Sequence, residues 1–169
     1  KDSFITLTNA LTRHSGNIPI AKIEGRIKDK EECIRKFNRK YRTQLESSST
    51  PYSIKESITD LIGLRVVCLY EDDIHKIKKC FEEHFKVIDI TDKISQIEET
   101  EGSFGYKGLH LDLKLNTERQ QLPEYGIYAE FRFEVQIRTI IQDSWSVLDH
   151  KIQYKKSIPH ELRRRINIL

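Results

Sequence analysis

Two alternating segments carry the side chains best suited to chemistry. In FRFEVQIR (131–138), apolar residues occupy one side, and the other side carries Arg132, Glu134, Gln136 and Arg138. Alternation of this kind indicates a half-buried β-strand. A carboxylate and an amide between two arginines suit the binding of phosphate and of a metal ion. A salt-bridge ladder on a wet sheet face accounts for this pattern equally well.

The second segment, LHLDLKL (109–115), places its leucines on one side and His110 on the other. Directly before it, GYKG (105–108) sets an aromatic residue between two glycines. Glycine allows a backbone to approach a ligand closely, and an exposed aromatic ring can stack on a base. An ordinary turn with a surface tyrosine is the alternative.

A basic cluster surrounds the predicted start of a helix, for which Asp29 is a suitable N-cap. Its members are Arg26, Lys28, Lys36, Arg39 and Lys40. A helix N-terminus with converging cations suits a polyphosphate. A solvated charged face is the commoner explanation of such a cluster taken alone. Asp60 lies before an apolar run, LRVVCLY (64–70), where it is either a metal ligand or a turn residue.

Periodicity predicts the elements that position these residues. We expect helices within residues 1–20, after Asp29, and over 52–60, 72–85 and 140–155, with another beginning near His160. We expect strands over 64–70, 87–90, 109–115 and 131–138, and a loop over 116–130. On the helix that follows residue 139, an apolar stripe (Ile141, Trp145, Leu148, Ile152) lies apart from Asp143, His150 and Tyr154. This order predicts an α+β domain with a mixed sheet flanked by helices.

Composition indicates a charged globular chain. Its 169 residues are 37% hydrophobic and 33% charged, with a net charge of +3. We expect a single domain over residues 1–169 and, because Met is absent, a fragment of a longer protein. Cys33, Cys68 and Cys80 have no CxxC spacing, so we expect buried thiols in a reducing cytoplasm. No apolar run is long enough to span a bilayer, so no membrane partner is expected.

Four blocks, in order, resemble the synthetase domain of the RelA/SpoT family, the alarmone (p)ppGpp synthetases. They are RIK (26–28) with Lys36, DLIGLRVV (60–67), GYKGLH (105–110), and EVQIRT (134–139) continuing into Trp145, LDHK (148–151) and YK (154–155). The last block is most similar to the single-domain small synthetases. The resemblance covers most of the chain and implies a nucleotidyltransferase-like fold.

The resemblance also implies the transfer of the β,γ-pyrophosphate of ATP to the ribose 3′-hydroxyl of GDP or GTP. Asp60 and Glu134 would be catalytic and would hold Mg²⁺. ATP would contact Arg26, Lys28, Lys36 and Arg65. The guanosine nucleotide would contact Tyr106, Lys107, His110, Gln136, Arg138, His150 and Lys151. Self-association into a homo-oligomer is a further expectation.

Two positions depart from the common family pattern. Many members have Ser where this chain has Glu32, near the triphosphate, and Ser where it has Gly108, in the acceptor loop. The second change leaves open a toxin-type relative that transfers pyrophosphate to the 3′ end of tRNA. A catalytically silent nucleotide- or RNA-binding module is the other alternative.

Overall fold

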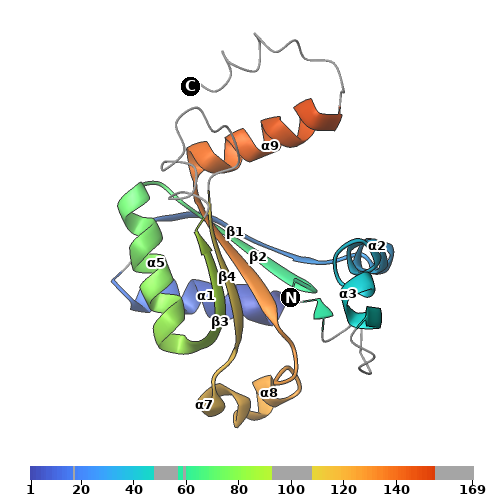
Figure 1. The fold of residues 1–169 in the computed structure, drawn as a ribbon. Coiled ribbons are helices and arrows are strands. Elements are labelled where there is room, and N and C mark those ends of the chain that lie inside the picture. The colour runs from blue at the N-terminus through green and yellow to red at the C-terminus, as the bar shows by residue number, and fades with distance from the viewer. Residues whose placement is uncertain (17, 48–56, 59, 93–107, 155–169) are drawn as a thin grey trace.

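A five-stranded mixed sheet organises the molecule (Figure 1). The computed structural model describes residues 1–16, 18–47, 57–58, 60–92 and 108–154, with side chains as far as residue 148. In sheet order, the strands are β1 (Ile20–Ile27), β2 (Ile62–Cys68), β5 (Phe133–Thr139), β4 (Leu109–Leu115) and β3 (Phe85–Asp92). Only β2 and β5 pair in parallel; the other pairs are antiparallel. The predicted α+β class is confirmed.

The core lies on one face of this sheet. Alternate residues of β2, β4 and β5 are buried there against α1 (Asp2–His14) and α5 (Glu71–His84). The two helices contribute amphipathic stripes that include Phe4, Leu7, Ile77 and Phe81. Because the strands have a period of two, burial of this face leaves their polar residues together on the opposite face.

The remaining helices lie around the sheet rather than over its buried face (Figure 1). They are α2 (Lys30–Lys40), α3 (Arg42–Ser47), α7 (Thr117–Gln120), α8 (Pro123–Gly126) and α9 (Ile140–Tyr154). α2 and α3 lie near the end of the sheet where β1 ends and β2 begins, and α9 continues directly from the end of β5. The predicted passage from strand to helix near Thr139 is therefore confirmed.

The sequence prediction missed β1 entirely. Its isoleucines, Ile20, Ile23 and Ile27, are three and four residues apart, as on a helix. The strand lies at the edge of the sheet, and its register with β2 is irregular between Ile20 and Lys22. The predicted loop over 116–130 contains two short helices, α7 and α8. The predicted helix over 52–60 and the one near His160 lie mostly or wholly outside the described residues.

Burial differs between α9 and the cysteines. On the apolar stripe of α9, Ile141 is 68% exposed and Leu148 is 50% exposed, so these two residues do not belong to the core. The three cysteines are free and buried, as predicted, and burial raises the pKa of the Cys68 thiol to about 11. In the part of the chain that the structure describes, no helix has the length and apolar character required to cross a membrane.

Candidate active site

Strand register gathers the predicted site residues on the polar face of the sheet. Glu134 lies opposite Gly63 of β2 and Asp112 of β4. Two residues further along β5, Gln136 lies opposite Arg65 of β2 on one side and His110 of β4 on the other. Residues more than 70 positions apart in sequence thus become neighbours, which the resemblance implied but the spacing alone did not show.

Glu134 lies on the central strand and is held at both carboxylate oxygens. His110 Nδ1 donates to Oε1 at 2.7 Å, and Gln136 Nε2 donates to Oε2 at 2.9 Å. Burial acts to raise the pKa of Glu134, but the hydrogen bonds from His110 and Gln136 outweigh it and hold the pKa below its usual value. Glu134 is therefore a carboxylate at neutral pH, able to accept a proton or bind a cation.

Asp60 lies just before β2 and is held by two lysines. Lys28 Nζ is 2.5 Å from Oδ2, and Lys36 Nζ is 2.9 Å from Oδ1. Burial acts to raise the pKa of Asp60, but its contacts with Lys28 and Lys36 lower it by more. Asp60 in turn acts to raise the pKa of Glu134, so the two carboxylates lie close enough to interact.

A small second core fixes this cluster. Cys33, Phe37 and Ile58 are buried together, and Leu61 packs against them. The backbone N–H of Lys28 also donates to the Leu61 carbonyl at 2.9 Å, which joins the end of β1 to the segment carrying Asp60.

The start of α2 is capped as predicted. The Asp29 side chain accepts from the backbone N–H of Glu31 at 2.8 Å and of Glu32 at 3.3 Å. The side chain of Glu32 is exposed, as are those of Arg39 and Lys40, so these residues lie outside the cluster.

A cavity of about 380 Å³ opens between β1, β2 and β5. Its lining residues are Glu24, Gly25, Arg26, Gly63, Leu64, Arg65 and Gln136. This volume is within the range of small-molecule sites. The Arg26 side chain lies across Gly63 of β2, since a Cβ at Gly63 would be in van der Waals contact with it, 3.5 Å from both Cγ and Nε. Two guanidinium groups in one cavity suit phosphate binding and stacking on a planar base.

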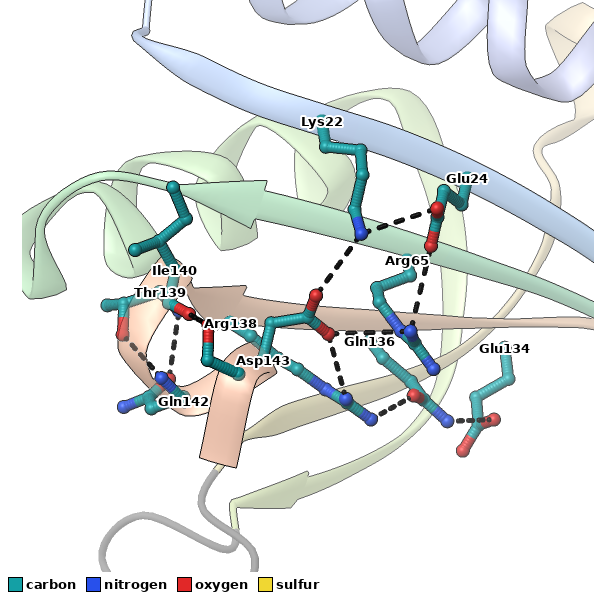
Figure 2. A network of polar contacts seen from close by, with 11 residues as sticks. Lys22, Glu24, Arg65, Glu134, Gln136, Arg138, Thr139, Ile140, Gln142 and Asp143 are labelled. Atoms are coloured by element: carbon teal, nitrogen blue, oxygen red, sulfur yellow. Dashed lines mark hydrogen bonds and ion pairs between the residues drawn. The ribbon is translucent and has the colours of Figure 1, made fainter. Parts of the chain in front are cut away.

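Beside the cavity lies a polar network that the sequence analysis did not predict (Figure 2). Asp143, from the first turns of α9, is within 3.2 Å of Arg138, 3.3 Å of Lys22 and 3.4 Å of Arg65. Glu24 lies 3.3 Å from Lys22 and 3.6 Å from Arg65. Lys22 and Glu24 were missed because β1 was missed, so nothing indicated that they face β2.

The structure brings together most of the predicted site residues. Asp60, Lys28 and Lys36 form one cluster, and His110, Glu134 and Gln136 form another. Arg26, Arg65 and Gln136 line the cavity. Arg138 is only 4% exposed and bonds to Gln136 and Asp143. Tyr106, Lys107 and the side chains of His150 and Lys151 lie outside what the structure describes.

Comparison with known proteins identifies the family. Residues 25–159 match the model of a region found in RelA/SpoT proteins. The chain belongs to the RelA/SpoT family. The match extends from within β1 through α9 and contains both carboxylates and every cavity-lining residue except Glu24.

Individual relatives agree with this assignment. The chain is 30% identical over 151 residues to GTP pyrophosphokinase YwaC of Bacillus subtilis (strain 168), covering 87% of the chain and 65% of YwaC. The crystal structure of small alarmone synthetase 2 from B. subtilis superposes with a TM-score of 0.72 at 26% identity, covering 98% of this chain and 82% of that one. Small alarmone synthetase 1 from B. subtilis, bound to its product pppGpp, gives 0.66 at 26% identity, covering 98% and 78%.

Proposed function

We propose that this RelA/SpoT-family chain transfers the β,γ-pyrophosphate of ATP to the ribose 3′-hydroxyl of GDP or GTP. One observation carries the proposal: two ionised carboxylates, Asp60 and Glu134, interact on the polar face that holds a cavity containing Arg26 and Arg65. The proposal is further supported by a relative named GTP pyrophosphokinase and by a similar synthetase bound to pppGpp.

The reaction requires positioning more than covalent help. The 3′-oxygen of the acceptor attacks the β-phosphorus of ATP, the bond from that phosphorus to the α,β-bridging oxygen breaks, and AMP leaves. The hydroxyl proton passes to a base. For phosphoryl transfer, alignment of the reactants and neutralisation of phosphate charge supply most of the rate enhancement.

The donor side is the cavity and the lysine cluster beside it. Arg26 and Arg65 line the cavity and can stack on a base or pair with phosphate. Lys28 and Lys36 contact Asp60 and can also bind phosphate oxygens. These four cationic side chains, from β1, β2, α2 and the residue that follows β1, are the ones that the resemblance assigns to ATP.

The residues present fit a bound Mg²⁺. Mg²⁺ prefers oxygen ligands and commonly takes one or two carboxylates together with substrate phosphates. Asp60 and Glu134 supply two ionised carboxylates, although Asp60 Oδ1 and Oδ2 are ion-paired with Lys36 and Lys28 in this structure. Within the described residues, no group of three or more acidic, His or Cys side chains could hold a metal alone. When bound, Mg²⁺ would neutralise phosphate charge.

The acceptor side lies toward β4. Glu134 is ionised and can take the proton of the 3′-hydroxyl, and His110 and Gln136 fix its two oxygens. The resemblance adds Tyr106 as a platform for guanine and Lys107, His150 and Lys151 as further contacts. Arg138, being buried, acts on the acceptor side through Gln136. A cytoplasmic location and self-association stay predictions.

One assay with three acceptors tests the proposal. The protein is incubated with Mg²⁺ and ATP labelled on the γ-phosphate, with GDP, GTP or bulk tRNA in parallel. Label on a guanosine nucleotide is expected and also ranks GDP against GTP. Label on tRNA alone would replace this proposal with the toxin-type reaction. Absence of transfer to any acceptor would indicate a binding module and overturn it.

A further inference from the structure

Asp143 is the point at which three cations meet. Its Oδ1 lies 3.2 Å from Arg138 Nη1 and 3.4 Å from Arg65 Nη1, and its Oδ2 lies 3.3 Å from Lys22 Nζ. The Asp143 side chain is 10% exposed and that of Arg138 is 5% exposed. A buried guanidinium needs a counter-charge, and Asp143 provides it from outside the cavity.

Local structure fixes where this carboxylate lies. α9 continues from β5 without a loop, so Asp143 in its first turns lies close to Arg138 at the end of β5 (Figure 2). Thr139 and Gln142 form a reciprocal cap: Gln142 N–H donates to Thr139 Oγ1 at 3.2 Å, and Thr139 N–H donates to Gln142 Oε1 at 3.0 Å. Asp143 follows this cap directly and is thereby held at a fixed distance from Arg138.

A directed chain of hydrogen bonds leads from Asp143 to Glu134. Arg138 Nη1 donates to Asp143, and Arg138 Nη2 donates to Gln136 Oε1. Because a guanidinium can only donate, the Gln136 amide must turn its oxygen toward Arg138. Its nitrogen then faces Glu134 and donates to Oε2 at 2.9 Å. Reversing the amide would place an oxygen against the Glu134 carboxylate.

We propose that Asp143 is a positioning residue, which acts through Arg138 to fix the orientation of the Gln136 amide and so the placement of the Glu134 carboxylate. Arg65, which lines the cavity, also contacts Asp143 Oδ1, but this ion pair is not part of the route to Glu134. This inference rests on the proposed function, because it assigns Asp143 a part in pyrophosphate transfer.

Charge neutralisation alone would make a different prediction. If Asp143 only compensates the charge of Arg138, then Asp143→Glu, which keeps the charge, should have wild-type activity. If position matters, the extra methylene displaces the carboxylate and kcat falls although the protein folds. Asp73→Asn is the matched control, since Asp73 is also buried and ion-paired, to Lys76 at 2.8 Å, but lies outside this network.

Steady-state kinetics with saturating ATP and acceptor give the first test. We expect Asp143→Asn to lower kcat at least about 10-fold and Asp143→Glu to lower it more than Asp73→Asn does. In a Gln136→Ala background, adding Asp143→Asn should change kcat by less than about 2-fold, because the route to Glu134 is already broken. Unchanged kcat in both Asp143 variants, or multiplicative losses in the double variant, would overturn the inference.

A measurement independent of activity separates this inference from the proposed function. The side-chain NH₂ signals of Gln136, assigned by their loss in Gln136→Glu, are recorded by ¹⁵N NMR for the wild type and Asp143→Glu. We expect them to shift in Asp143→Glu and to stay unchanged in Asp73→Asn. Unshifted signals would overturn the positioning role even in an active enzyme. Shifted signals in a protein without transfer activity would support the hydrogen-bond route while the proposed function fails.

Discussion

The carboxylates of Asp60 and Glu134 are both ionised, but different neighbours keep them so. The pKa of Asp60 is lowered by hydrogen bonds from Lys28 and Lys36 and by their charges, whereas that of Glu134 is lowered by hydrogen bonds from His110 and Gln136 and by the charge of His110. Around Asp60, the two lysines could release the carboxylate and bind the phosphate groups of a nucleotide instead. The contacts of Glu134 leave an oriented carboxylate able to accept a proton or bind a cation.

At the residue scale, Glu134→Gln should abolish pyrophosphate transfer while the protein stays folded. The amide has nearly the same volume but cannot accept the 3′-hydroxyl proton and binds a cation poorly. We expect kcat to fall at least about 10²-fold, as for loss of a general base. The labelled-ATP assay measures the loss, circular dichroism checks folding, and Glu124→Gln, an exposed carboxylate on α8, is the control. Near-normal turnover would rule out a catalytic Glu134.

Lys28→Met should reduce stability at neutral pH. The folded pKa of Asp60 is below its ordinary value of 3.8, so its ionised form stabilises the fold above that value, and this contribution is lost as pH falls through the folded pKa. Removing Lys28 leaves one lysine on a largely buried carboxylate. We expect a loss of about 1–3 kcal/mol in the free energy of unfolding at pH 7.

Urea unfolding at pH 7 and near pH 3 tests this linkage. The difference between Lys28→Met and the wild type should begin to shrink below pH 3.8, because the contribution of ionised Asp60 is lost as the pH falls toward and through its folded pKa. Lys79→Met is the control, because Lys79 is exposed and lies 3.9 Å from Glu83. An equal loss at both pH values would show that the methylene stem of Lys28, rather than its charge, stabilises the fold.

At the element scale, the junction of β5 and α9 determines where the network of Asp143 lies. The sequence Thr139-Ile140-Ile141-Gln142 has the Thr-x-x-Gln spacing of a capping box, and the structure shows both of its hydrogen bonds. Because the cap satisfies the first turn internally, α9 can begin without a connecting loop. Ile141, in this first turn, is exposed and does not belong to the core.

Thr139→Ala should destabilise the domain by about 1–2 kcal/mol, the usual cost of losing an N-cap side chain. Thr139 is buried, so water cannot readily replace its hydroxyl. Thermal and urea unfolding measure the loss. Ser144→Ala removes an exposed hydroxyl that donates to the Ile140 carbonyl on the same helix, and it should change stability by less than about 0.5 kcal/mol. Equal effects of the two substitutions would argue against the cap.

At the scale of the whole molecule, all the large buried strand residues of β4 lie on one side. The leucines of β4, alternate residues of β2 and β5, and the stripes of α1 and α5 form a single core on that side. The sheet is thus stabilised from one face, which frees the other for charged residues. Gly25 allows α1 to pack closely on β1, since a Cβ there would lie 2.9 Å from Ile5 Cδ1.

Leu111→Ala should destabilise the whole domain by about 2–5 kcal/mol, because Leu111 is fully buried at the centre of this core. Unfolding of both the sheet and the active site should follow the same transition, seen by circular dichroism and by loss of nucleotide binding. Ile127→Ala, at a residue that is 71% exposed, should cost little. Separate transitions for the two signals would show that the polar face folds independently of the core.

The sequence by itself determined the elements with regular periods and the residue types of the site. Leu109–Leu115 and Phe133–Thr139 alternate without interruption, and the Asp72–Phe85 stripe repeats as in a helix, so their local geometry follows from their own order. Asp29 as an N-cap followed in the same way, since capping depends on neighbouring backbone groups. Motif resemblance added Asp60 and Glu134 as partners.

Tertiary structure alone decided which distant residues meet. The β1 strand escaped prediction because an edge strand is stabilised by pairing with β2, which no local period records. For the same reason, neither the contacts of Lys22 and Glu24 nor the role of Asp143 could be read from spacing. The α9 stripe correctly predicted a helix, but a period identifies a helix face and not what covers it. Burial and ion pairing depend on which strands and helices pack together, and only the folded chain specifies that packing.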